Sequence, residues 1–221
     1  GNYSDVFIYA PMHWYLLNTM TIVIPTIIGA VFTSSLAAYA FARLRAPGKN
    51  ALFLLVLATL MLPSVVTLVP TYVLFAKLGW VGTFRPLILP PLAGSAFNIF
   101  LLRQFFMTLP RELEDAALID GCSRFRIYWT IVLPLSKPVL ATVTIFAFMG
   151  AWNDYLGPLI YLGNQAQYTL SLGLQAFVQY HKAEWGMLMA ASTMMVVPVI
   201  LIFFFAQQNF VQGITLTGIK G

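Results

Sequence analysis

The stretch WYLLNTMTIVIPTIIGAVFTSSLAAYAFA spans residues 14–42 and contains no charged side chain. A membrane-crossing helix needs about 20 predominantly apolar residues, because the hydrocarbon core is ~30 Å thick and each residue adds about 1.5 Å. This stretch exceeds that length, so the sequence predicts that it crosses a lipid bilayer. Pro25 lies within it, and proline is tolerated in membrane helices because neighbouring helices satisfy the freed carbonyl groups.

Four further apolar stretches meet the same length requirement. Their approximate bounds are 51–75, 86–107, 139–162 and 185–206. Most of them contain or adjoin proline, which predicts bent helices, an arrangement that suits a cavity better than a solid bundle. We therefore predict an all-α, polytopic membrane helix bundle of about five spans. Its expected parts are an extracytoplasmic lead-in at 1–13, a transmembrane domain at 14–210 and a cytoplasmic C-terminal tail at 211–221.

The amino-acid composition also indicates that lipid is part of the solvent. The chain has 221 residues, of which 60% are hydrophobic and 9% are charged, whereas a soluble domain has about 25% charged residues. The formal net charge is +5, but the basic residues are scattered singly, without the basic face that nucleic-acid binding requires. No nucleic-acid partner is therefore expected. The single cysteine, Cys122, excludes an intramolecular disulfide and a paired-cysteine metal site.

The distribution of Lys and Arg predicts the orientation of the chain, because cytoplasmic loops are enriched in both residues. Nine basic residues fall on one side of the predicted spans: Arg43, Arg45, Lys49, Arg103, Arg111, Arg124, Arg126, Lys137 and Lys220. Three fall on the other side: Lys77, Arg85 and Lys182. The C-terminus and the loop 107–138 are therefore expected in the cytoplasm, and the start of the chain outside. Because an outward start is awkward to insert, we expect a further span upstream, which would complete a core of six helices.

Small side chains recur at steps of four along the first predicted span, at Ala30, Ser34, Ala38 and Ala42. Such a stripe lets another helix approach closely in lipid, where van der Waals packing replaces the hydrophobic drive. The stripe therefore predicts a contact with another subunit or within the bundle. Ordinary alanine-rich helix composition is an equally good explanation.

A polar interruption lies near the outer end of the fourth predicted span, at Trp152, Asn153, Asp154 and Tyr155. An unpaired carboxylate is costly inside a membrane, so an intramembrane aspartate is a functional candidate by default. These four residues are our candidates for the substrate path. The alternative is an interfacial belt, in which Trp152 and Tyr155 lie among the headgroups and Asp154 meets water.

Neither a catalytic nor a metal site is evident. His13 and His181 lie far apart, and neither has a second ligand at i+3 or i+4. The motifs HExxH, GxSxG and GxGxxG do not occur in the sequence. We therefore predict that this chain has no catalytic residue and no metal.

Residues 109–121, LPRELEDAALIDG, concentrate acidic side chains on the predicted cytoplasmic side. Pro110 signals a helix start, because its missing N–H would be unsatisfied there anyway. Three acids follow, where they complement the positive end of the helix dipole: Glu112, Glu114 and Asp115. Two bases lie further along, where they would complement the negative end: Arg124 and Arg126.

This helix is not cleanly amphipathic. Leu113, Ala116 and Ala117 share one face on a helical wheel, but Asp120 falls among them. A small-residue surface flanked by charges suits a groove on another protein better than a lipid surface. Gly121 allows close approach or a bend at that point.

The same segment resembles a known family. Asp115-Ala116-Ala117, then Gly121, then Ile131-x-Leu133-Pro134 is similar to the EAA loop of binding-protein-dependent ABC importer permeases, at about residues 108–135. The spacing matches throughout, and the one departure is Asp115 where the family usually has Glu.

Three other segments resemble the permeases of the carbohydrate-uptake branch, and within it the maltose-system G-type subunit. They are residues 35–43 (SLAAYAFAR), residues 151–154 (AWND) and residues 211–221 (VQGITLTGIKG).

The resemblance implies a bacterial or archaeal inner-membrane subunit that passes a sugar or related solute inward and hydrolyses nothing itself. ATP and Mg would lie on a separate ATPase dimer, and a second, different permease subunit and an extracytoplasmic solute-binding protein would complete the importer. The implied ATPase-coupling residues are Glu114, Asp115, Ala116, Ala117, Asp120, Gly121, Ile131, Leu133 and Pro134. The tail would also reach the ATPase dimer, through Gly218, Lys220 and Gly221.

Two other classes of function stay open at this stage. A membrane-embedded enzyme using Asp154 would need a second catalytic residue converging within the bilayer. A membrane scaffold or assembly protein would use the small-residue stripe and the cytoplasmic helix, but would leave the bent spans and the long loop unexplained.

Overall fold

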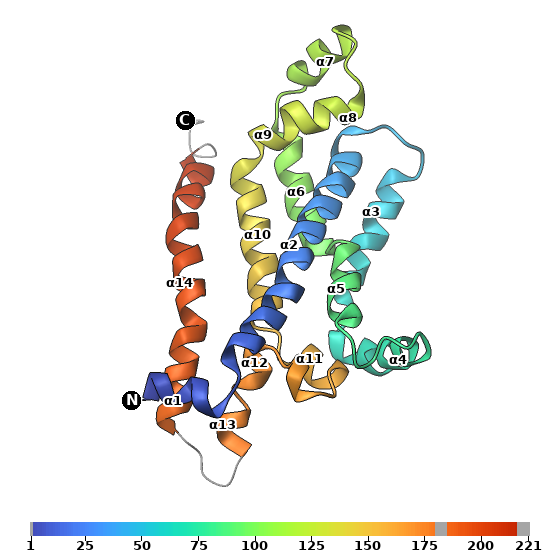
Figure 1. Ribbon diagram of the computed structural model, residues 1–221. Coiled ribbons are helices and arrows are strands. Elements are labelled where there is room, and N and C mark those ends of the chain that lie inside the picture. Colours follow the sequence, from blue (N-terminus) through green and yellow to red (C-terminus); the bar gives the residue numbers. More distant parts are fainter. Residues whose placement is uncertain (1, 180–184, 216–221) are drawn as a thin grey trace.

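The computed structural model describes residues 2–179 and 185–215, and these residues form helices and connecting loops without a β-strand. The helices that run along the bundle in Figure 1 are α2 (Met12–Arg43), α3 (Lys49–Ala58), α5 (Arg85–Leu92), α6 (Ala96–Thr108), α10 (Lys137–Trp152) and α14 (Trp185–Thr215). One end of the bundle carries α7 (Arg111–Ile119), α8 (Arg124–Ile127), the π-helical turn η2 (Tyr128–Val132) and α9 (Leu133–Leu135). The other end carries α1 (Asn2–Tyr9), α4 (Ser64–Lys77), α11 (Leu156–Tyr161), α12 (Leu170–Gly173) and α13 (Ala176–Gln179). Two short 3₁₀ turns are η1 (Thr59–Met61) and η3 (Gln165–Gln167).

The prediction of an all-α membrane bundle is confirmed. Three helical segments are long and apolar enough to cross a membrane: Met12–Arg43, Arg85–Thr108 and Trp185–Phe204. Two bent pairs of helices raise the number of candidate spans to as many as five within the described residues. The outward-facing surface is rich in apolar side chains, as on α3 and α4, which fits a lipid environment.

The second predicted span is broken rather than continuous. Lys49–Met61 and Ser64–Lys77 meet at an angle of 98°, and α4 lies across the end of the bundle in Figure 1. The turn occurs at Pro63, whose backbone is extended (φ −61°, ψ 133°). Proline lacks an N–H and its ring clashes with a continuing helix, so the apolar run 51–75 bends there.

The third predicted span holds a local break inside the expected range. α5 ends at Leu92 and α6 begins at Ala96, and Gly94 between them has φ +85°. Ser95 donates its backbone N–H to Ser34 Oγ of α2 at 3.2 Å. Irregular backbone at membrane depth is tolerated where protein or a cavity takes up its polar groups.

The fourth predicted span is shorter than expected, because α10 ends at Trp152 instead of continuing to Leu162. Asn153 and Asp154 leave the helix, and α11 is a separate short element. At its start, α10 meets the preceding helical segment Arg124–Leu135 at an angle of 84°. The bend lies where the chain passes from the α7 end of the bundle into the predicted span.

The small-residue stripe of α2 packs within this chain. Ala30, Ser34, Ala38 and Ala42 are all buried, and α2 makes its main contacts with α6, α10 and α5. A side chain added at Gly29 would collide with Leu92 of α5. The stripe therefore serves contacts inside the bundle.

Basic residues divide between the two ends of the bundle as the orientation argument expects. The turn after α2 and the segment from α7 to α9 lie at one end, and α4 and the start of α5 lie at the other (Figure 1). The far end of α14 lies at the α7 end. Lys182 and Lys220 lie outside the described residues.

Candidate functional site

The helix α7 begins where the sequence predicts. Pro110 immediately precedes Arg111, the first residue of α7, and Glu112 and Glu114 fall in the first turn. Acids there stabilise the helix by complementing the unpaired N–H groups and the positive end of the dipole. Local sequence is therefore sufficient to start this helix.

The predicted role of Arg124 and Arg126 at the C-terminal end of the same helix is wrong. α7 ends at Ile119, and Gly121 follows with φ +79°. Cys122 donates its backbone N–H to Ala117 at 2.9 Å, which closes the helix end. The two arginines belong to α8, which starts anew with Ser123 Oγ accepting from the Arg126 N–H at 3.3 Å.

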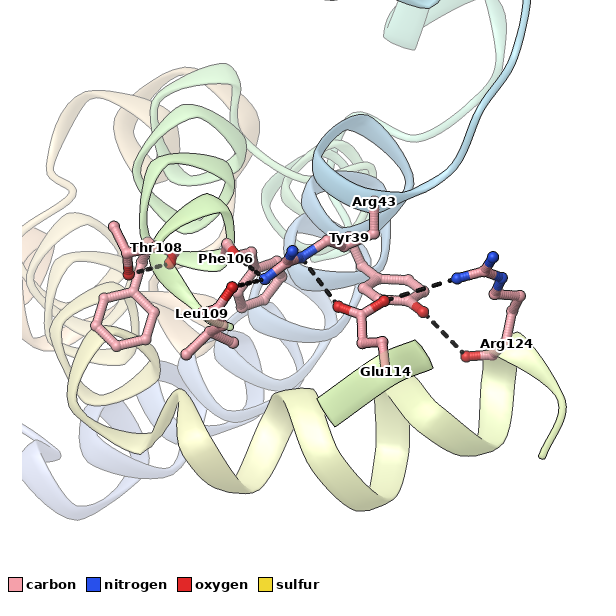
Figure 2. Close-up of polar contacts among 8 residues, drawn as sticks. Tyr39, Arg43, Phe106, Thr108, Leu109, Glu114 and Arg124 are labelled. Atoms are coloured by element: carbon pink, nitrogen blue, oxygen red, sulfur yellow. Dashed lines mark hydrogen bonds and ion pairs between the residues drawn. The ribbon is translucent and has the colours of Figure 1, made fainter. Parts of the chain in front are cut away.

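A buried ion pair joins α7 to the rest of the bundle (Figure 2). Arg43 at the end of α2 lies with its Nε 3.0 Å from Oε1 of Glu114, and the two side chains are only 3% and 6% exposed. The contact is an ion pair without the alignment of a hydrogen bond. Arg124 places Nη1 3.8 Å from Glu114 Oε2. A buried charge needs such partners, because an unpaired one is strongly destabilising.

Arg43 also caps α6. Its Nη2 donates to the carbonyl oxygens of Phe106 at 2.5 Å and Leu109 at 2.6 Å, and Figure 2 shows both contacts on the side away from Glu114. The last carbonyls of a helix lack partners within the helix. One guanidinium therefore holds the ends of α2 and α6 and the first turn of α7 together.

Two tyrosines extend this junction to α8. Tyr39 donates its hydroxyl to the Arg124 carbonyl at 3.3 Å. Tyr128 is fully buried, and its hydroxyl lies 2.7 Å from Ser35 Oγ. The two rings pack with centroids 5.3 Å apart. The α7–α8 segment is thus attached to α2 through polar contacts that are specific in geometry.

The outward face of α7 is exposed and carries both charged and apolar side chains. Ile119 is 87% exposed and Leu113 is also exposed, whereas Glu114 and Ala117 face the bundle. Asp115, Ala116, Asp120 and Gly121 are all exposed as well. Of the predicted coupling residues on this helix, the structure thus separates an inward pair from an outward group.

The remaining predicted coupling residues lie in η2 and α9 at the base of the segment. Ile131 and Leu133 are half-buried against the core, and Pro134 is exposed. The predicted tail residues Gly218, Lys220 and Gly221 lie outside the described residues.

A cavity of about 370 Å³ lies between α2, α5, the start of α6 and the end of α10, in the half of the bundle away from α7. Its size falls within the ~300–1,000 Å³ range of small-molecule sites. Polar residues from several segments line it: Thr19, Thr26, Ser95, Asn98, Asp154 and Thr169. The break between α5 and α6 opens onto it, through Gly94 and Ser95.

Among the four predicted substrate-path residues, only Asp154 lines this cavity. Its Oδ1 accepts from the Gly157 N–H at 3.0 Å. Asn153 donates its side-chain amide to the Met149 carbonyl at 2.9 Å, and Tyr155 is exposed.

Trp152 has a structural position in the core. It is fully buried, its ring stacks on Phe148, and its indole N–H donates to the Met195 carbonyl of α14 at 3.1 Å. The interfacial-belt interpretation is therefore wrong for Trp152. Its burial between two helices could not be read from its place at the end of an apolar run.

Sequence reasoning also missed several residues of the junction and the cavity. Arg43 was counted as a topology charge and as the end of the segment 35–43, but neither observation predicted its contact with Glu114. The cavity residues Thr26, Phe97, Asn98 and Phe146 gave no separate signal, because polar and aromatic side chains are common within membrane spans. Asn98 shares the third predicted span with a second amide side chain, Gln104, so an amide in that span did not by itself mark the cavity.

Comparison with known proteins identifies the relatives of this chain. The family model "binding-protein-dependent transport system inner membrane component" matches residues 29–216. An arabinooligosaccharides transport system permease protein, AraQ, from Halalkalibacterium halodurans is 36% identical over 100% of this chain and 79% of its own length. An osmoprotective compounds uptake permease protein, GgtD, from Synechocystis sp. is 36% identical over 100% of this chain and 74% of its own length.

A third relative is the sn-glycerol-3-phosphate transport system permease protein UgpE from Yersinia enterocolitica, 37% identical over 93% of this chain and 73% of its own length. Among solved structures, a bacterial ABC transporter involved in the import of the acidic polysaccharide alginate has a chain with a similar fold. The TM-score is 0.83 at 23% identity, covering 95% of this chain and 79% of that chain.

Proposed function

Because this chain belongs to the family of binding-protein-dependent transport system inner membrane components, we propose a route by which its geometry couples ATP hydrolysis on a partner to solute movement. The chain is a transport permease subunit of an ABC importer, not an enzyme. An importer of this family works with an ATPase and a solute-binding protein. The scaffold and intramembrane-enzyme alternatives are not favoured.

The cargo in this proposal is a sugar or a related polyhydroxylated solute. Support comes from the names of three relatives, which transport arabinooligosaccharides, osmoprotective compounds and sn-glycerol-3-phosphate. The alginate importer, with a similar fold, carries a polysaccharide. Arabinooligosaccharides and sn-glycerol-3-phosphate both carry hydroxyl groups.

The observation that carries the coupling proposal is the buried Arg43–Glu114 ion pair. It attaches the inner face of α7 to the bundle while Leu113 and Ile119 on the outer face stay exposed. In the proposal, a groove of the ATPase subunit receives this outer face. A displacement of α7 would then move the ends of α2 and α6 with it, because Arg43 also binds the Phe106 and Leu109 carbonyls.

The same two helices reach the cavity. α2 carries Thr26, which lies 17 residues before Arg43, or about 26 Å at 1.5 Å per residue. α6 carries Asn98, eight residues before Phe106. The main contacts between helices are those of α2 with α6. Each helix therefore has one end at the cavity and the other at the α7 junction, which is the connection that coupling requires.

The proposal also covers the orientation of this chain in the membrane and its partner subunits. The basic end with α7 would face the cytoplasm together with the C-terminal tail, including Gly218, Lys220 and Gly221. An ATPase dimer, holding the ATP and Mg, would bind there, and a second, different permease subunit and lipid would surround the bundle. The exposed apolar side chains of α3, α4 and α14 support such a surface.

Site-directed photo-cross-linking in the assembled importer tests the docking of α7. Cys122 is the single cysteine, so Cys122→Ser gives a cysteine-free background. Ile119→Cys in that background, labelled with a benzophenone maleimide, places the probe on the exposed face of α7. Val178→Cys, on exposed Val178 of α13 at the other end of the bundle, is the matched control.

The expected result is an adduct between the Ile119 probe and the ATPase subunit on irradiation, with no such adduct from the Val178 probe. Adducts of the Ile119 probe with lipid alone, or an ATPase adduct from position 178 instead, would contradict the proposal.

A further inference from the structure

We propose that the cavity between α2, α5, α6 and α10 is a binding subsite contributed by this chain itself, for an uncharged, hydroxyl-rich ring such as a sugar unit. The inference rests on the proposed function and specifies where this permease touches its cargo and which cargo it takes. Three independent features of the lining support it: an aromatic pair, unused polar groups and a lone carboxylate.

The aromatic pair is formed by Phe97 near the start of α6 and Phe146 of α10. Both rings line the cavity, both are exposed, and their centroids lie 5.7 Å apart. Pyranose and furanose rings have apolar C–H faces. These faces pack against aromatic side chains, which supply a flat apolar surface. The pair therefore offers a platform for one face of a sugar ring.

Polar groups on the cavity lining are available for hydrogen bonds with the hydroxyl groups of a ligand. Thr26 is only 5% exposed, and its Oγ1 has no hydrogen-bond partner among the described residues. Leaving such a buried hydroxyl unpaired costs free energy, so a polar ligand that reaches it gains a hydrogen bond. Asn98 is buried on the same lining, and its amide can both donate and accept.

Not every hydroxyl of the lining is available in this way. Thr19 donates to the Tyr15 carbonyl at 2.8 Å and accepts from the Leu170 N–H at 2.9 Å. Its hydrogen bonds hold α2 against α12. The contrast with Thr26 separates a structural hydroxyl from one that faces the cavity unpaired.

Asp154 sets the charge of the subsite. Its carboxylate has no basic side chain within 4.0 Å in the described parts of the chain, and no Lys or Arg lines the cavity. Its Oδ1 accepts from the Gly157 N–H, and the remaining lone pairs can accept from sugar hydroxyls. The same negative charge repels a phosphate or carboxylate. The cavity therefore favours uncharged over anionic solutes.

Two glycines give a steric test with a matched control. Gly150 of α10 lines the cavity, and a side chain added there meets no atom within 4 Å. Gly150→Leu would thus fill the cavity while raising helix propensity. Gly163 has the same open surroundings but lies outside the cavity lining, so Gly163→Leu is the control.

The experiment is saturation-transfer NMR on the complete transporter, with both permease subunits and the ATPase, in nanodiscs, using maltotriose and sn-glycerol-3-phosphate as probes. Wild type and Gly163→Leu should transfer saturation to the C–H protons of maltotriose. Gly150→Leu should raise the apparent Kd for maltotriose about tenfold or more. Asp154→Asn keeps an acceptor for the Gly157 N–H. It should weaken the binding of maltotriose and increase the saturation transfer to sn-glycerol-3-phosphate.

Three results would overturn the subsite. They are no transfer to maltotriose in wild type, equal transfer in wild type and Gly150→Leu, or a wild-type preference for sn-glycerol-3-phosphate. ATP hydrolysis stimulated by the binding protein, measured on the same samples, separates this failure from failure of the proposed function. Intact stimulation with an unaffected Gly150→Leu overturns only the subsite, whereas absent stimulation in wild type contradicts the importer itself.

Discussion

Glu114 and Asp154 are two carboxylates of the same chain in contrasting surroundings. Glu114 is buried between Arg43 and Arg124, with the nearer guanidinium nitrogen at 3.0 Å. Asp154 lines a cavity and accepts a backbone N–H, with no basic partner in the part of the chain that the structure describes. A carboxylate whose bonding capacity is filled by its own protein holds structure, and one left with free lone pairs at a cavity is available to a ligand.

The position of each carboxylate agrees with this division. Glu114 lies at the end of the bundle with the exposed helix α7, and Asp154 lies in the opposite half. α2 and α6 connect the two regions, since both helices contribute to the cavity and to the junction at Arg43. Three substitutions test the division, beginning with the largest expected effect.

Arg43→Ala should be the most damaging change. It leaves Glu114 buried with only the more distant Arg124, and it frees the carbonyls of Phe106 and Leu109. Removing one partner of a buried ion pair costs about 3–5 kcal/mol. We expect a large loss of thermal stability in nanodiscs, measured by intrinsic fluorescence, and loss of ATPase co-purification.

The control for this change is Arg45→Ala, because Arg45 is exposed two residues further along. It should leave both stability and co-purification close to wild type. Equal behaviour of the two variants would break the assignment of Arg43 as the residue that joins α2, α6 and α7.

Gly121→Val should have an intermediate effect, confined to the α7 end. Gly121 has φ +79°, and a side chain there meets no atom within 4 Å, so the penalty comes from the backbone alone. A left-handed conformation costs an ordinary L-residue about 1–2 kcal/mol. We expect weaker ATPase association at unchanged maltotriose affinity.

Gly121→Asn separates strain from side-chain bulk, because asparagine tolerates the left-handed region better than valine does. It should restore most of the ATPase association, measured by co-purification. If both variants associate equally poorly, the backbone conformation is not the reason for glycine at this position.

Trp152→Phe should have the smallest effect. It keeps an aromatic ring beside Phe148 and removes the hydrogen bond to the Met195 carbonyl. A hydrogen bond of this kind contributes about 0.5–1.5 kcal/mol. Thermal unfolding should shift slightly, and the Kd for maltotriose should not change. An altered Kd for maltotriose with unchanged stability would show that Trp152 acts in the substrate path, contrary to its structural position in the core.

Local features were the easiest to predict from the sequence. The start of α7 after Pro110 depends on residues adjacent in the chain and was predicted, whereas the break at Pro63 was not placed within the predicted span 51–75. Proline patterns nevertheless could not distinguish Pro63, where the chain turns, from Pro70, which lies inside α4. That choice depends on packing, which decides where a freed carbonyl group finds a partner.

Long-range features could not be predicted. Arg43 and Glu114 meet only because α2 and α7 end at the same place, and their spacing in the sequence carries no signal of the contact. The cavity likewise gathers Thr26, Asn98 and Asp154 from three separate segments. Asp154 was found because a charge beside an apolar run is unusual, whereas a threonine or a phenylalanine in such a run is not.

The most direct test of this division is ATP hydrolysis stimulated by the binding protein, measured in proteoliposomes for Glu114→Gln and Asp154→Asn. Both substitutions replace a carboxylate by the amide of the same shape. Glu114→Gln should lose most of the stimulation, because Arg43 is left as an uncompensated buried charge at the α7 junction. Asp154→Asn should keep wild-type stimulation, because the junction is intact. The opposite pattern, or equal loss in both variants, would contradict the account.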